Sequence, residues 1–229
     1  MAAEHRVTRK QLLKEPDAFQ VFSARFMAGL MKYRAWWITA LVLLILGGAG
    51  YGFYQNYLNQ KALKSEQLYF EMTRILEQGR QQPPEKVLEQ LKAKLQEIET
   101  SEQKTRARLL LADSLYQYGK YQEALQAYEE LLAEGGIDPL YRAFALQGRA
   151  HALESQKNFK KAIQAYKTVI DSPGSIPLFY SYLGLARSYA QSGDTQNAVL
   201  VLRDMKTKFP EHGDLAQVDT LLKRLEAQS

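Results

Sequence analysis

The strongest pattern in the sequence is an apolar stretch of twenty residues, Ala35–Tyr54, that contains no charged side chain. It opens with two tryptophans and closes with Tyr51, Phe53 and Tyr54. A helix of about 20 apolar residues crosses the ~30 Å hydrocarbon core of a bilayer, and aromatic rings favour both of its interfaces. We therefore predict a single-pass transmembrane helix over 35–54, rather than the buried core helix of a soluble domain.

Small residues at the end of this stretch leave a cleaved signal peptide as an alternative. However, 34 residues precede the stretch, whereas the charged region of a signal peptide is short. A lipoprotein anchor is excluded because the chain has no cysteine. Gly48 and Gly52 form a G-x-x-x-G pair, which predicts packing against another membrane helix. The alternative is that glycine is simply frequent in such helices.

Helical periodicity continues on both sides of the apolar stretch. Before it, Phe19, Phe22 and Phe26 share one face of a helix predicted at about 17–33. Such a helix can lie in the membrane interface or dock onto a partner membrane protein. After it, neither proline nor glycine occurs until residue 79, which predicts a stalk helix that ends in a loop at 79–84.

Residues 101–212 contain three similar units, each with the pattern of two helices. In each unit an alanine is followed four residues later by a larger side chain, and successive alanines are 38 and 36 residues apart. Small residues where two helices touch, repeated at about 34 residues, define the tetratricopeptide pattern. The pairs are Ala124 with Tyr128, Ala162 with Tyr166, and Ala198 with Leu202.

The segments that flank these units fit the two ends of a repeat array. Residues 55–100 are predicted to form the stalk helix and a degenerate first repeat, with Val87 and Leu91 in the alanine and aromatic places. Residues 213–229 are predicted to form a helix that shields the last apolar face of the array. The predicted fold class is therefore all-α: a transmembrane helix that continues into a stalk, then a tetratricopeptide-repeat α-solenoid with a C-terminal capping helix.

Positive charge is concentrated before the apolar stretch. Residues 1–34 carry seven basic and three acidic side chains, whereas residues 55–229 carry 23 and 22. Basic residues that flank a membrane helix stay on the cytoplasmic side. We therefore expect a protein of the bacterial inner membrane, with the N-terminal tail at 1–34 in the cytoplasm and the repeats in the periplasm. This tail suits anionic membrane lipid, and the nearly neutral repeats argue against nucleic-acid binding.

The sequence contains no recognisable catalytic motif. It has neither a phosphate-binding loop nor a nucleophile elbow, and its histidines (His5, His151 and His212) are isolated from one another. We therefore predict a protein that is not an enzyme, with no metal, no cofactor and no small-molecule substrate.

In repeat arrays of this kind the first helices of successive units line a concave groove. Aromatic side chains interleaved with both signs of charge suit a peptide or a protein partner, although a repeat face can carry mixed residues that bind nothing. The predicted groove residues are Arg106, Leu109, Asp113, Tyr116, Phe144, Gln147, His151, Glu154, Tyr180, Leu183 and Arg187.

The architecture, together with Trp36 to Tyr54 and the segments LADSLYQYGKYQEALQAYEELL and LGLARSYAQSGDTQNAVLVLRDM, resembles the ancillary SecYEG translocon subunit (YfgM-type) family of bacterial inner-membrane proteins. The resemblance implies a non-enzymatic partner of the translocon that links exported chains to periplasmic chaperones. A scaffold of another envelope complex, in division, polysaccharide export or outer-membrane assembly, is the alternative. The oligomeric state is left open.

Overall fold

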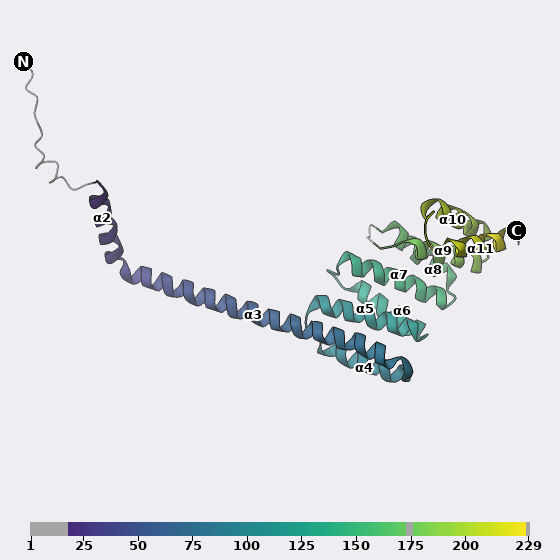
Figure 1. Cartoon of the computed structure of the whole chain (residues 1–229), viewed down its shortest axis with the longest axis horizontal. Helices are drawn as coiled ribbons and strands as arrows, with labels where there is room; N and C mark the ends of the chain where they lie inside the picture. Colours follow the sequence, from purple (N-terminus) through teal and green to yellow (C-terminus); the bar gives the residue numbers. More distant parts are fainter. Residues whose placement is uncertain (1–17, 173–175, 228–229) are drawn as a thin grey trace, which may run out of the picture. The chain divides into compact units, whose positions relative to one another are not determined.

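The computed structural model describes residues 18–172 and 176–227, and the regular elements in these ranges are all helices (Figure 1). The chain divides into two compact units, residues 1–59 and 60–229. Most of the charged residues of the predicted cytoplasmic tail lie outside the described residues.

The N-terminal unit contains α2 (Ala18–Lys32) and the first part of α3 (Arg34–Gln78). The side chains of Phe19, Phe22 and Phe26 are exposed, and the rings of the last two stack with their centroids 6.3 Å apart. α3 is long and apolar enough to cross a membrane, and its most apolar part is not buried by any described residue.

The second unit begins with the C-terminal part of α3, which is followed by a short 3-10 helix, η1 (Gly79–Gln81), and by α4 (Pro84–Glu97). A proline suits the first position of α4, because the N–H that it lacks would have no partner inside the helix. Met72 is fully buried, as are Val87 and Leu91 of α4. A side chain at Gly79 would collide with Val87, because an added Cβ would lie 2.7 Å from a Val87 methyl carbon.

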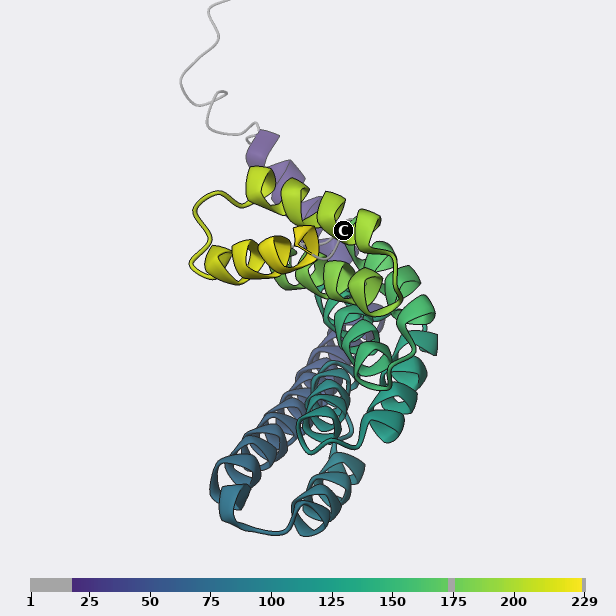
Figure 2. The same cartoon turned by 90° about the vertical axis from the view of Figure 1, so that its right-hand side faces the viewer.

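Three helix pairs and a final helix follow. They are α5 (Ser101–Gln117) with α6 (Tyr121–Ala133), α7 (Pro139–Ser155) with α8 (Phe159–Asp171), α9 (Phe179–Gln191) with α10 (Thr195–Lys208), and α11 (Leu215–Glu226). Figure 2 shows that these pairs follow a curve, with α11 packed beside the last pair.

The three pairs share the same turn between their two helices. One residue in each turn has a positive φ: Gly119 at 75°, Lys157 at 61° and Gly193 at 88°. Glycine adopts this left-handed conformation without steric cost, whereas a side chain with a Cβ does so at a cost. The middle turn therefore carries a residue that its backbone conformation does not favour.

One continuous hydrophobic core runs from α3 to α11. The three alanines that mark the predicted repeats, Ala124, Ala162 and Ala198, are all fully buried in it. Val218 and Leu222 of α11 are also buried, and α11 packs on α10. The described residues thus confirm a helical array with solenoid-like repeats.

Candidate partner-binding groove

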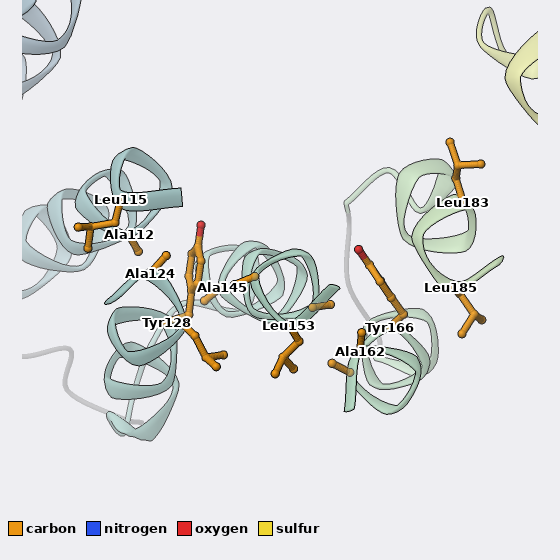
Figure 3. Close-up of a cluster of buried hydrophobic side chains, with 14 of the residues drawn as sticks. Ala112, Leu115, Ala124, Tyr128, Ala145, Leu153, Ala162, Tyr166, Leu183 and Leu185 are labelled. Carbon is orange, nitrogen blue, oxygen red and sulfur yellow. The ribbon is translucent and has the colours of Figure 1, made fainter. Parts of the chain in front are cut away.

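Two buried tyrosines join successive repeats. Tyr128 and Tyr166, 1% and 0% exposed, each pack against a glycine on the first helix of the next repeat. A Cβ added at Gly148 would lie 2.3 Å from the ring of Tyr128, and one added at Gly184 would lie 2.3 Å from the ring of Tyr166. Because these glycines have no side chain, each ring extends across the junction, and Figure 3 shows its hydroxyl at the far end.

At the first junction, between the first and second repeats, the hydroxyl of Tyr128 contacts one carboxylate. Tyr128 donates a hydrogen bond of 2.5 Å to Oδ1 of Asp113, on α5 of its own repeat. Burial raises the pKa of Asp113 above its usual range, although the hydrogen bond from Tyr128 opposes the shift.

At the second junction the hydroxyl joins a larger network. Tyr166 donates to Oε2 of Glu154 at 2.5 Å, and its oxygen lies 2.7 Å from Nδ1 of His151. The same carboxylate accepts hydrogen bonds from Nε and Nη2 of Arg187, at 2.7 and 2.9 Å. Burial holds the pKa of His151 below its usual value. The network thus ties together α7, α8 and α9.

A cleft on the first helices of the repeats, called the first cleft below, has a volume of about 290 Å³ and lies between α5 and α7. The side chains that line it combine aromatic, amide and ionisable groups, and the Tyr116 ring lies 6.4 Å from the His151 ring, centroid to centroid. Five predicted groove residues are brought together here. The lining residues are Asp113, Tyr116, Gln117, Tyr128, Phe144, Gln147, Gly148 and His151.

The second cleft, about 470 Å³, lies between α9 and α11. It contains two more predicted residues, Leu183 and Arg187. The sequence predicted only a capping role for α11, so the α11 side of this cleft was not expected; the polar residues opposite the buried leucines were the available signal. The lining residues are Leu183, Arg187, Ala190, Gln191, Ala216, Gln217, Thr220, Leu221 and Arg224.

The other predicted groove residues lie elsewhere. Arg106 pairs with Glu66 of α3 at 2.9 Å and lies 4.2 Å from the centroid of the Tyr69 ring. Leu109 packs, half-buried, against the core. Tyr180 is 46% exposed and donates a hydrogen bond to Asp214 at the start of α11.

Glu154 is part of the second junction and does not line either cleft as the described residues define them. Gly48 and Gly52 lie on the open surface of α3, where an added Cβ would meet no described atom within 4 Å. In residues 18–172 and 176–227, no cluster of three or more histidine, aspartate or glutamate side chains could hold a metal.

Comparison with protein families identifies the repeats. Residues 30–173 match the model of the tetratricopeptide repeat-like domain, which is more than half of the chain. The chain belongs to the tetratricopeptide repeat-like domain family. Residues 180–212 match a further tetratricopeptide repeat model, in agreement with the third helix pair. A comparison with curated proteins gave no match.

Solved structures share the tetratricopeptide fold at low sequence identity. The kinesin light chain repeats from Podosopora anserina are 19% identical, with a TM-score of 0.56 over 71% of this chain and 86% of that one. A tetratricopeptide repeat protein from Parabacteroides merdae is 17% identical, with a TM-score of 0.56 over 72% of this chain and 61% of that one. MamA from Desulfovibrio magneticus is 17% identical, with a TM-score of 0.50 over 72% of this chain and 97% of that one.

Proposed function

We propose that this protein is a membrane-anchored protein–protein interaction module that holds a partner polypeptide in the groove formed by the first helices of its repeats. The first cleft carries the proposal, because it unites side chains from two repeats, including the half-buried Tyr116 and the 38% exposed Phe144. Aromatic anchors beside amide and charged groups are typical of the centre of a protein interface.

The exposed apolar part of α3 supports a membrane anchor. Leu44 is 72% exposed and is surrounded in sequence by other exposed apolar side chains, which water solvates poorly and lipid solvates well. With the N-terminal basic residues in the cytoplasm, the repeats occupy the periplasm of a bacterium. Gly48 and Gly52 offer a flat helix surface to a second membrane helix.

The partner set that we propose is the SecYEG translocon, together with exported chains and periplasmic chaperones. Its basis is the resemblance to the ancillary translocon subunits. The alternative is a structural scaffold for another envelope complex, which would use the same groove to hold one stoichiometric partner. Neither role requires a catalytic group, and we propose that the protein is not an enzyme.

Site-specific photo-crosslinking in living cells tests this function. The full chain carries a photoreactive amino acid at one of three positions: Gly48 in the apolar helix, Phe144 in the first cleft, or Gln196 on α10. Gln196 is exposed and lines neither cleft, so it is the control. Adducts are identified by mass spectrometry.

We expect translocon subunits at Gly48, and exported chains or chaperones at Phe144 but not at Gln196. The same single complex at Gly48 and Phe144 would favour the scaffold. Equal yields of the same adducts at Phe144 and Gln196 would contradict a binding groove.

A further inference from the structure

The second cleft differs from the first in its chemistry. Its floor is apolar and comes from both helices, with Leu183 and Ala190 on α9 and with Ala216 and Leu221 on α11. The charged side chains that line it are Arg187 and Arg224, and no acidic side chain of the described residues lines it. A lining of this kind accepts an apolar side chain next to a negative charge.

The positive charge of this cleft is not cancelled by its own helices. α9 contains no acidic residue, and the two acidic residues of α11 are engaged with α10. Asp219 pairs with Lys206 at 2.7 Å, and Glu226 pairs with Arg203 at 2.7 Å.

The carboxylate of Glu154 neutralises Arg187, the first of the two arginines, at the second repeat junction. The guanidinium group of Arg224 makes no hydrogen bond or ion pair within the part of the chain that the structure describes. The pair of arginines therefore leaves about one positive charge at the cleft, and Arg224 carries it.

The cleft has the length of a short extended segment. Its lining runs along α9 from residue 183 to residue 191, which at 1.5 Å per residue is about 12 Å. An extended chain covers this distance in about four residues, at roughly 3.3 Å each. In such a segment alternate side chains point to opposite sides, so one side can reach the apolar floor while the other turns toward the arginines.

We propose that the cleft between α9 and α11 binds an internal, extended segment of a partner polypeptide in which apolar residues alternate with aspartate or glutamate. The apolar side chains lie over Leu183 and Leu221, and an acidic side chain pairs with Arg224. This inference rests on the proposed function, because it names the class of partner segment that the groove selects.

Binding of defined peptides to the full chain in phosphatidylcholine nanodiscs tests the inference. The probes are fluorescein-labelled twelve-residue peptides with blocked ends, in which leucine alternates with glutamate, glutamine or lysine. A fourth probe is the leucine–glutamine peptide with a free C-terminal carboxylate. Fluorescence anisotropy gives each dissociation constant at low and high salt.

We expect the leucine–glutamate peptide to bind most tightly and to weaken as salt rises. Arg224→Gln should weaken it about fivefold to tenfold and leave the leucine–glutamine peptide unchanged. Lys223→Gln is the matched control, because it removes the same charge from the adjacent exposed position, which lines no cleft, and it should change nothing. Thr220→Trp should fill the cleft and weaken every probe.

The inference is overturned if no probe binds, if the glutamine or lysine peptide binds as tightly as the glutamate peptide, or if Lys223→Gln and Arg224→Gln have equal effects. If the probe with the free carboxylate binds most tightly, the cleft recognises the C-terminus of a chain rather than an internal segment, and the inference is overturned. Circular dichroism verifies that each variant is folded. If the peptide experiment fails but groove-specific adducts are retained at Phe144, the proposed function stands and only this inference is lost. If those adducts are lost but the peptides still bind, the proposed function is lost and peptide binding by the second cleft stands.

Discussion

The two repeat junctions are built on the same steric plan but carry different polar groups. In both, a tyrosine on the second helix of a repeat fits against a glycine on the next repeat. Tyr128 then meets the single carboxylate of Asp113, whereas Tyr166 meets a network of His151, Glu154 and Arg187.

This difference shows that steric fit and polar linkage have separate roles. The tyrosine–glycine contact sets how closely successive repeats approach, and it is the same at both junctions. The polar groups then decide which helices are tied together. The carboxylate of the first junction lines the first cleft, whereas the second junction joins three helices and holds Arg187 in the lining of the second cleft.

Filling the glycine position should have the largest effect. Gly184→Ala places a methyl group 2.3 Å from the buried Tyr166 ring, and we expect a loss of about 2–3 kcal/mol in the free energy of unfolding, despite the better helix propensity of alanine. Gly135→Ala is the control, because an added Cβ there meets nothing within 4 Å. Chemical denaturation measures both, and Tyr166→Leu in the Gly184→Ala background should restore part of the loss. Equal stabilities of the two glycine variants would refute the shared steric plan.

Removing the charge at the centre of the second junction should have the next largest effect. Glu154→Gln leaves the half-buried Arg187 with a poorer acceptor, so we expect a loss of about 1–2 kcal/mol. Asp113→Asn should cost less, about 0.5–1 kcal/mol, because the amide oxygen still accepts from Tyr128. Urea denaturation measures both, with the exposed Glu211→Gln as a neutral control. A larger cost at Asp113 than at Glu154 would reverse the comparison.

The two junctions should also respond to pH in opposite directions. The pKa of Asp113 is raised in the folded state, so the folded protein binds more protons above about pH 3.9, and the free energy of unfolding falls as pH rises through the raised pKa. The pKa of His151 is lowered, so the unfolded chain binds more protons below about pH 6.5, and the free energy of unfolding falls as pH decreases.

These two trends are measured as stability differences between the wild type and each variant. Asp113→Asn should remove the first trend and His151→Gln the second. Stability curves of wild type and variant that run parallel from about pH 4 to about pH 8 would contradict both assignments.

The smallest expected effect concerns the turn inside the middle repeat. Lys157 has a φ of 61°, where the equivalent turns have glycine. Lys157→Gly removes a strain of roughly 1–2 kcal/mol but adds chain entropy to the unfolded state, so we expect a gain of about 0.5 kcal/mol. Thermal denaturation of this variant beside Lys160→Gly, which should destabilise α8, provides the check. A loss of stability at position 157 would mean that the lysine side chain has contacts that outweigh its backbone strain.

The sequence predicted the repeat fold well, because its signals are local. The three alanine pairs marked the helix contacts, and the absence of proline and glycine before Gly79 marked the end of α3. Five of the predicted groove residues share one cleft because the repeat geometry places equivalent positions on one face.

The rest depends on contacts between distant residues. Spacing alone does not reveal that Glu66 reaches Arg106, since forty positions separate them along the chain. The contacts of Gly148 with Tyr128 and of Gly184 with Tyr166 were not predicted, although the two glycines occupy equivalent positions in successive repeats. The face of α11 that lines the second cleft was not predicted, because a capping role accounts for the buried leucines of this helix.

If the groove on the first helices holds a partner polypeptide, truncating its aromatic side chains should abolish binding, whereas truncating an exposed leucine elsewhere should not. In cells, adducts from a photoreactive group at Gln147, in the first cleft, are quantified for the wild type, for the Tyr116→Ala, Phe144→Ala double variant and for Leu200→Ala. Leu200 is 61% exposed on α10 and lines neither cleft. We expect the double variant to lose most of the adducts with exported chains or chaperones, while Leu200→Ala retains them. Unchanged adducts in a folded double variant would contradict partner binding in the groove.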